Sequence, residues 1–197
     1  MIIVGLTGSI AMGKTETAKM FKRLGIPVYS ADEAVHDLYA ANGAAVNPIG
    51  NLFADVIENG EVNREKLSLK ILGDPGMVSE IESLVHPLVR EKQNQFIAAS
   101  RKKGDPLVVL DIPLLFETGG ETRVDRVVVV TAPADVQAKR ALARPGMTRE
   151  KLDLILSRQM PDEEKRAKAD YIVETGRGLE HAFFQVEEIV DDLMKRS

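Results

Sequence analysis

Apolar residues form five short runs along the chain, and several of them are followed by segments whose apolar positions recur at helical spacing. Continuous apolar runs are typical of strands buried on both faces of a parallel sheet. Their alternation with amphipathic helices indicates an α/β fold. The expected strands are residues 2–6, 26–29, 107–111, 124–130 and 171–173. The pattern therefore predicts one α/β unit with a five-stranded, mainly parallel sheet.

Residues 33–105 interrupt this alternation because their apolar spacing is helical throughout. Asn47-Pro48 is expected to start a helix that continues through Ile57, and Asn59-Gly60 reads as a turn between helices. His86-Pro87 is expected to interrupt the last helix of this stretch, since proline removes a helical hydrogen bond. The segment is therefore predicted to be a wholly helical insertion. Outside it, helices are expected at 15–24, 133–142, 149–160, 162–168 and 179–194.

The first apolar run leads into Gly8–Thr15, which fits the phosphate-binding pattern G-x-x-x-x-G-K-[ST]. Gly8 and Gly13 allow a tight turn that brings backbone N–H groups around phosphate oxygens, and the following helix directs its positive end at the same anion. Lys14 is expected to be an exposed charge that reaches the β- and γ-phosphates, and the Thr15 hydroxyl is expected on Mg²⁺. The alternative, a glycine turn beside a solvated lysine, does not explain why a strand precedes the loop and a helix follows it.

Composition narrows the function without changing the fold class. With 44% hydrophobic and 28% charged residues and no cysteine, the 197-residue chain is typical of a globular protein without disulfides or thiolate metal sites. The first run begins at Ile2 and no run approaches a membrane span, so we expect a cytoplasmic protein with neither signal peptide nor membrane contact. The net charge is −4, but residues 138–168 carry +4. A local basic patch favours a small anionic ligand over nucleic acid.

Two acidic residues lie at the carboxyl ends of expected strands, where ligands bind in open α/β sheets. Asp32 follows the second strand, and it either caps the next helix or takes part in chemistry. Asp111 ends the third strand, like the second magnesium-associated acid of P-loop proteins. A strand-end acid without a metal role fits Asp111 equally well.

Taken together, several motifs resemble those of the dephospho-CoA kinases, which are P-loop kinases that phosphorylate the 3′-hydroxyl of the dephospho-CoA ribose. The matches follow the family's order over roughly 170 positions. Besides the opening Gly5–Thr15, they are Val28–Asp32, Arg64-x-x-Leu67, His86-Pro87, Pro113–Glu117, Gln137-x-x-Arg140 with Arg144, and Ala169–Ile172.

The chain departs from the family at a few positions. Ala11 stands where the family usually has glycine, so the backbone there should not need a positive φ. Thr15 and Glu16 replace a usual serine and threonine, and Ser30 replaces the first acid of an Asp-Ala-Asp signature. Thr175-Gly176 lies where many members have Asn-Gly near the adenine. None of these departures removes a residue that the chemistry requires.

The resemblance implies a three-layer P-loop kinase fold with a helical acceptor insertion and a helical lid. The nucleotide-binding core would comprise residues 1–32, 106–137 and 169–197. Residues 33–105 would form the acceptor subdomain and residues 138–168 the lid. The expected reaction is transfer of a phosphoryl group from ATP to dephospho-CoA, giving coenzyme A and ADP.

The resemblance also implies roles for individual residues. Asp32 would act as base or orienter, Lys14 would hold phosphates, and Arg140 would meet charge on the transferred group. ATP would contact Gly8, Ser9, Ile10, Ala11, Met12, Gly13, Lys14, Thr15, Glu16, Arg140, Thr175 and Gly176. The acceptor would contact Asp32, Arg64, His86, Leu114 and Glu117, with Mg²⁺ on Thr15. Glu117 has an alternative role, pairing with a basic residue to hold its loop. A monomer is the expected form.

Other functions of P-loop proteins fit less well. A kinase acting on a nucleoside monophosphate or shikimate would share the P-loop, but not His86-Pro87 or Pro113–Glu117. A GTP-dependent switch would need Asp-x-x-Gly after the third strand, and Asp111–Leu114 does not fit that pattern. A nucleic-acid motor would need a strand-binding track, which the acidic charge and 5% aromatic content do not provide.

Overall fold

The computed structural model describes residues 1–195, which form two compact units. The first unit consists of residues 1–29 together with the chain from Ser100 onward, and the second consists of residues 30–99. The chain therefore leaves the first unit after the second strand and returns to it just before the third strand of the large sheet.

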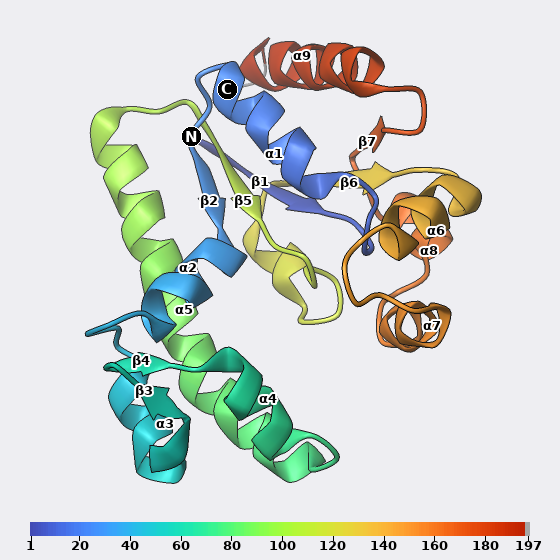
Figure 1. The fold of residues 1–197 in the computed structure, drawn as a ribbon. Coiled ribbons are helices and arrows are strands. Elements are labelled where there is room, and N and C mark those ends of the chain that lie inside the picture. Colours follow the sequence, from blue (N-terminus) through green and yellow to red (C-terminus); the bar gives the residue numbers. More distant parts are fainter. Residues whose placement is uncertain (196–197) are drawn as a thin grey trace. The chain divides into compact units, whose positions relative to one another are not determined.

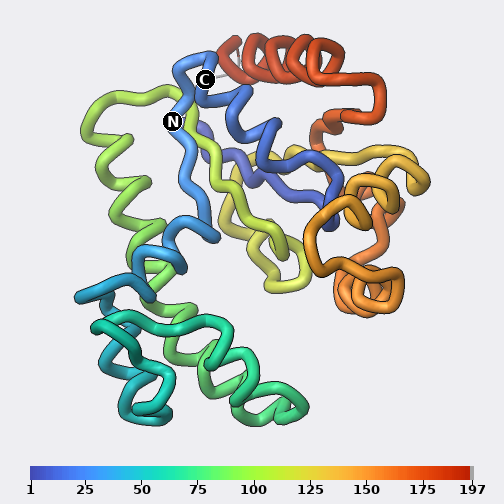
Figure 2. The backbone as a smooth tube through the Cα atoms, viewed as in Figure 1, coloured from blue at the N-terminus to red at the C-terminus, as the bar shows by residue number. Residues whose placement is uncertain are grey.

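A five-stranded sheet in the order β2-β5-β1-β6-β7 forms the framework of the first unit. β1 lies between β5 and β6, parallel to both, and β7 continues the sheet in parallel beyond β6. Figure 2 shows residues 2–7 and 107–111 side by side although they are far apart in sequence. The strands are β1 (Ile2–Thr7), β2 (Val28–Ser30), β5 (Leu107–Asp111), β6 (Arg126–Thr131) and β7 (Tyr171–Glu174). The predicted five-stranded sheet is confirmed.

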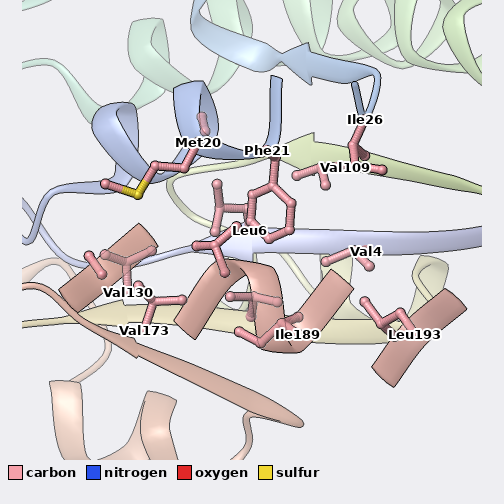
Figure 3. Close-up of a cluster of buried hydrophobic side chains, with 14 of the residues drawn as sticks. Val4, Leu6, Met20, Phe21, Ile26, Val109, Val130, Val173, Ile189 and Leu193 are labelled. Carbon is pink, nitrogen blue, oxygen red and sulfur yellow. The ribbon is translucent and has the colours of Figure 1, made fainter. Parts of the chain in front are cut away.

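Two helices cover one face of this sheet, α1 (Lys14–Arg23) and α9 (Leu179–Lys195). The apolar positions of α9 recur at helical spacing, so one side of the helix is buried against the strands. Figure 3 shows Phe21 of α1 and Ile189 of α9 meeting Leu6 of β1 in this core. The remaining helices of the unit are η2 (Gly120–Arg123), α6 (Ala134–Leu142), α7 (Arg149–Ser157) and α8 (Asp162–Ala167).

The opposite face of the sheet is buried by the segment that follows β5. Val128 and Val130 of β6 belong to the α1 and α9 core, whereas Val127 and Val129 pack with Leu115 and Phe116. Successive strand residues point to opposite faces, so this division indicates a sheet covered on both sides. Because β5, β1, β6 and β7 run parallel, their carboxyl ends and the loops that follow them lie along one edge of the sheet.

The second unit is mainly helical and has a core of its own around Leu38, Ile49 and Val56. Its elements are α2 (Ala31–Tyr39), α3 (Val46–Leu52), η1 (Ala54–Val56), β3 (Ile57–Glu58), β4 (Glu61–Val62), α4 (Arg64–Ile71) and most of α5 (Pro75–Lys103). All of them except η1 are labelled in Figure 1.

The expectation of a wholly helical insertion was wrong at β3 and β4, which pair as a short antiparallel hairpin. Asn59 and Gly60 both have positive φ, 52° and 80°, as the tightest hairpin turns require. The turn was recognisable, but strands of two residues are too short to show an alternating pattern. The helix expected to run through Ile57 accordingly ends at Leu52.

The expected interruption at His86-Pro87 was also wrong, because α5 is continuous through Pro87. Proline inside a helix costs about 3 kcal/mol or more. Ile81 and Val85 before it and Leu88 after it pack into the same core. The burial of these side chains on both sides of the proline offsets the lost helical hydrogen bond.

Candidate active site

The loop Gly8–Gly13 joins β1 to α1 and has the geometry of a phosphate cradle. A side chain at Gly8 would place its Cβ 2.6 Å from the Val130 carbonyl oxygen, so only glycine fits there. Gly13 has a φ of 102° and directly precedes the first residue of α1. The backbone thus turns sharply into a helix N-terminus, which favours an anion at this point.

Ala11 does not behave as expected, because its φ is 61°. The prediction that this position needs no positive φ was therefore wrong. A left-handed conformation costs a residue with a Cβ about 1–2 kcal/mol. The Ala11 methyl group is buried against Ala141 of α6 and Leu152 of α7, and this packing offsets part of that cost.

Lys14 is the first residue of α1, and it is less exposed than the sequence led us to expect. Its side chain is 13% exposed, and its Nζ donates a hydrogen bond of 2.5 Å to Oδ1 of Asp111 at the end of β5. β1 and β5 are paired neighbours, so the loop after one strand meets the acid at the end of the other. The sequence identified both residues but not their pairing.

Arg140 and Thr175 come together at the same edge of the sheet. The two terminal nitrogens of Arg140 donate to the Thr175 hydroxyl and to its carbonyl oxygen, each at 2.8 Å. The Thr175 hydroxyl in turn donates to the Met12 carbonyl oxygen at 2.6 Å. Thr175, which the sequence assigned to the adenine region, therefore links Arg140 on α6 to the phosphate-binding loop.

Gly176 is held by the same region. Its N–H donates to a carboxylate oxygen of Glu174 at 2.6 Å, and a Cβ on Gly176 would lie 2.6 Å from Pro133. The segment has no room for a side chain at this position.

Glu117 forms an ion pair of 2.8 Å with Lys165 of α8, whose side chain is completely buried. Glu117 also accepts a hydrogen bond of 2.8 Å from the Met160 N–H. Burial alone raises the pKa of Glu117, but the Lys165 and Met160 hydrogen bonds outweigh it, so that the pKa lies below its ordinary value. These contacts support the alternative role for Glu117, which is to hold its loop. Leu114 in the same loop is 42% exposed.

Asp32 lies in the second unit, in the first turn of α2, and its side chain is exposed. The N-cap of α2 is Ser30, whose hydroxyl accepts a hydrogen bond of 3.2 Å from the Glu33 N–H. The hypothesis that Asp32 caps this helix was therefore wrong. An acid in the first turn still complements the helix dipole.

The two other residues assigned to the acceptor also lie in the second unit. Arg64 is the first residue of α4 and lies over the ring of Tyr39, 5.2 Å from its centroid. Burial raises the pKa of the Tyr39 hydroxyl, and the Arg64 charge opposes this shift. His86 is exposed on α5. Neither the Arg64–Tyr39 contact nor the exposure of His86 identifies a ligand.

Two features bear on metal and membrane binding. Among residues 1–195, no group of three acidic, histidine or cysteine side chains is arranged to hold a metal ion. The exposed Thr15 hydroxyl at the start of α1 fits a magnesium ion whose other ligands are nucleotide phosphates and water. Within the same residues, none of the helices combines the length and apolar character that crossing a bilayer requires.

The sequence of this chain matches that of a known family. The family model described as dephospho-CoA kinase matches residues 2–180. The chain is 54% identical over 193 residues to a dephospho-CoA kinase of Mesorhizobium japonicum, covering 98% of this chain and 97% of the relative. It is 53% identical to a dephospho-CoA kinase of Rhizobium meliloti, with 98% of each chain covered.

Solved structures agree in fold. A crystal structure from Thermus thermophilus has a TM-score of 0.83 at 32% identity, covering 96% of this chain and 95% of that one. Dephospho-CoA kinase from Campylobacter jejuni has a TM-score of 0.69 at 20% identity, covering 97% and 96%, which shows a shared fold.

Proposed function

The chain belongs to the dephospho-CoA kinase family, and from this premise we propose how its residues carry out phosphoryl transfer. The chain is a dephospho-CoA kinase, an ATP-dependent phosphotransferase of coenzyme A biosynthesis with a P-loop. The observation that carries the proposal is the loop Gly8–Gly13 entering α1 with Lys14 beside the end of β5.

In the proposed reaction, the 3′-hydroxyl oxygen of the dephospho-CoA ribose attacks the γ-phosphorus of ATP. The new O–P bond forms as the bond from the γ-phosphorus to the β,γ-bridging oxygen breaks, and ADP leaves. Asp32 accepts the hydroxyl proton or orients the hydroxyl for attack. Phosphoryl transfer depends mainly on positioning and on stabilising negative charge, so a carboxylate, a lysine and an arginine suffice as the protein's part.

The nucleotide end of the site follows from the same loop. The amides of residues 8–16 and the Lys14 ammonium hold the phosphates, and Thr175 and Gly176 lie against the adenine. Thr15 would hold Mg²⁺, which when bound would supply positive charge to offset the negative charge of the phosphates. Lys14 would exchange its bond to Asp111 for phosphate oxygens, because both partners are anionic oxygens.

The acceptor end comprises Arg64 and His86, within an acceptor subdomain of residues 33–105, together with Leu114 and Glu117 in the segment after β5. Residues 138–168 would be the lid, whose net charge of +4 suits a phosphate-rich ligand. Glu117 is already engaged in the ion pair with Lys165, so we propose that it contributes to acceptor binding indirectly, by holding the loop that positions Leu114. We further propose that the protein acts in the cytoplasm as a monomer and binds neither nucleic acid nor membranes.

An assay of ADP release over an acceptor panel tests the substrate assignment. At matched concentrations we expect dephospho-CoA to be turned over well above AMP, adenosine and shikimate. The assay is repeated with excess chelator, where turnover should disappear because Mg²⁺ carries charge in the transition state. An acceptor profile in which dephospho-CoA is no better than AMP, or activity undiminished by the chelator, contradicts the proposal.

Arg140→Ala should lower kcat by about 10²-fold or more, since an arginine that meets transition-state charge typically contributes about 10³–10⁵ and neighbouring arginines compensate in part. To serve in this way, Arg140 would have to leave the two bonds that it makes to Thr175. Lys139→Ala, on an exposed neighbour in α6, is the matched control. A change confined to the KM for ATP would make Arg140 a ground-state contact only.

A further inference from the structure

Two glutamines hold the backbone of Ile10 in the phosphate-binding loop. The Ile10 N–H donates to the side-chain oxygen of Gln159 at 3.0 Å, and the Ile10 carbonyl oxygen accepts from the side-chain nitrogen of Gln137 at 2.9 Å. Gln137 is on α6, and Gln159 lies just after α7. These two side chains, 127 and 149 residues away in sequence, therefore satisfy both polar groups of a single loop residue.

The bonds fix two successive peptide groups, because the Ile10 N–H and carbonyl belong to different ones. In a trans peptide the N–H and the carbonyl point in opposite directions. Holding the Ile10 carbonyl on Gln137 therefore turns the Ala11 N–H away from Gln137. Holding the Ile10 N–H on Gln159 turns the Ser9 carbonyl away from Gln159, and that carbonyl accepts the Met12 N–H at 3.2 Å.

Packing acts on the same residues. Ala11 forms a buried cluster with Leu152 of α7 and Ala141 of α6, and Ile10 and Leu156 pack against this cluster. The strained backbone at Ala11, with a φ of 61°, lies directly after the peptide that Gln137 holds. Strained conformations persist only where surrounding structure determines them strongly. The two glutamines and the α7 side chains supply this support.

Gln159 is itself held in place through its neighbours in sequence. The Met160 N–H is bonded to Glu117, and Asp162 accepts a hydrogen bond of 2.6 Å from the Thr131 hydroxyl at the end of β6. The segment that carries Gln159 is thus attached to the loop after β5 and to the end of β6. The Gln159 side chain connects this segment to the phosphate-binding loop by its hydrogen bond to Ile10.

We propose that Gln159 and Gln137 are positioning residues, which hold the Ile10 peptide groups so that the amides after Ile10 face the ATP phosphates. The inference rests on the proposed ATP site. It gives the segment 138–168 a second role besides its charge, since part of that segment sets the shape of the loop that binds the nucleotide.

Substitutions of Gln159 separate this role from general stability. Gln159→Leu removes the acceptor, so amide hydrogen exchange at Ile10 in the nucleotide-free protein should become about 2- to 13-fold faster, the factor that corresponds to one net hydrogen bond. The KM for ATP should rise by a similar factor, and the KM for dephospho-CoA should not change. Gln159→Glu keeps an acceptor oxygen and should restore slow exchange, while its charge still weakens ATP binding.

Gln95→Leu is the matched control, because Gln95 is an exposed glutamine on α5 whose side chain bonds only Glu91 among the contacts described. It should change neither exchange at Ile10 nor the KM for ATP. If Gln159→Leu does not fold, Gln159→Ala, which also removes the acceptor, carries the same comparison, with melting temperature recorded for each variant.

A double variant gives the second test. Gln137→Leu and Gln159→Leu together should raise the KM for ATP by less than the product of the two single effects, because either change alone releases the same loop residue. Exchange at Ile10 that is unchanged in Gln159→Leu would overturn the proposal, as would faster exchange without any change in ATP binding. The first readout needs no nucleotide, so it fails independently of the proposed ATP site.

Discussion

Lys14→Met should abolish turnover. Loss of one neutral donor that stabilises transition-state charge lowers kcat by about 10²–10³-fold in other enzymes. Lys14 carries a full charge directly after a loop whose amides converge on the same phosphates, so the loss should reach at least the upper end of that range. Steady-state ADP release with dephospho-CoA as acceptor measures it, and Lys19→Met on the exposed side of α1 is the matched control.

The effect of this variant on stability needs a separate control. The Asp111 side chain is 9% exposed, and Lys14→Met removes its cation. Loss of the cation from an ion pair in such a position destabilises the fold. Lys14→Met combined with Asp111→Asn should recover the melting temperature without recovering turnover. Turnover that returns with the melting temperature would make Lys14 a structural residue.

The phosphate-binding loop was predictable because its pattern is local. The spacing of Gly8, Gly13 and Lys14 specifies a strand, a turn and a helix N-terminus within about 20 residues. The conformation of Ala11 was not predictable in this way. Gln137 and Gln159 bond the backbone of the preceding residue and Leu152 packs with Ala11, and all three are more than 120 residues away in the chain. The one signal in the sequence was that the resembling family usually has glycine at this position. Glycine readily adopts a positive φ, and Ala11 adopts that conformation despite its side chain.

Strand order decides the other pairings that the sequence left open. Asp111 was recognised as a strand-end acid, but its contact with Lys14 requires that β5 be the neighbour of β1. Apolar runs predict strands and not their order. Glu117 and Lys165 likewise meet only because the segment after β5 and helix α8 lie on the same side of the sheet. Lys165 lies in a helix made mostly of charged residues, so the sequence does not indicate that its side chain is buried.

The start of α2 shows how a local signal can be assigned to the wrong residue. Ser30, Asp32 and the helix that follows them fit a capping pattern with either residue as the cap. Ser30 has extended backbone, with φ −112° and ψ 120°, and its hydroxyl accepts the Glu33 N–H. Asp32 is already helical, so its carboxylate has no capping bond to make. Capping therefore does not explain the acid at that position, and its structural effect is limited to complementing the helix dipole.

Asp32→Asn should therefore lower kcat by about 10²–10⁴-fold, the range for loss of a general base. A ribose hydroxyl has a high pKa and is a poor nucleophile, so it needs an acceptor for its proton and a fixed line of attack. Asparagine has the same shape as aspartate and cannot take the proton. ATP affinity should be nearly unchanged, because the proposed role of Asp32 concerns the acceptor hydroxyl. The measurement is kcat, ATP affinity and melting temperature on one preparation.

Two further variants assign the result to the right property of Asp32. Asp37→Asn makes the same change at another exposed position of α2 and should leave kcat unaltered. Ser30→Ala removes the actual cap and should cost about 0.5–2 kcal/mol of stability. The melting temperature of Asp32→Asn should instead stay near that of the unmodified protein, since only a favourable charge in the first turn is lost. Retention of more than about a third of kcat in Asp32→Asn lies far outside the general-base range and would remove Asp32 from the mechanism.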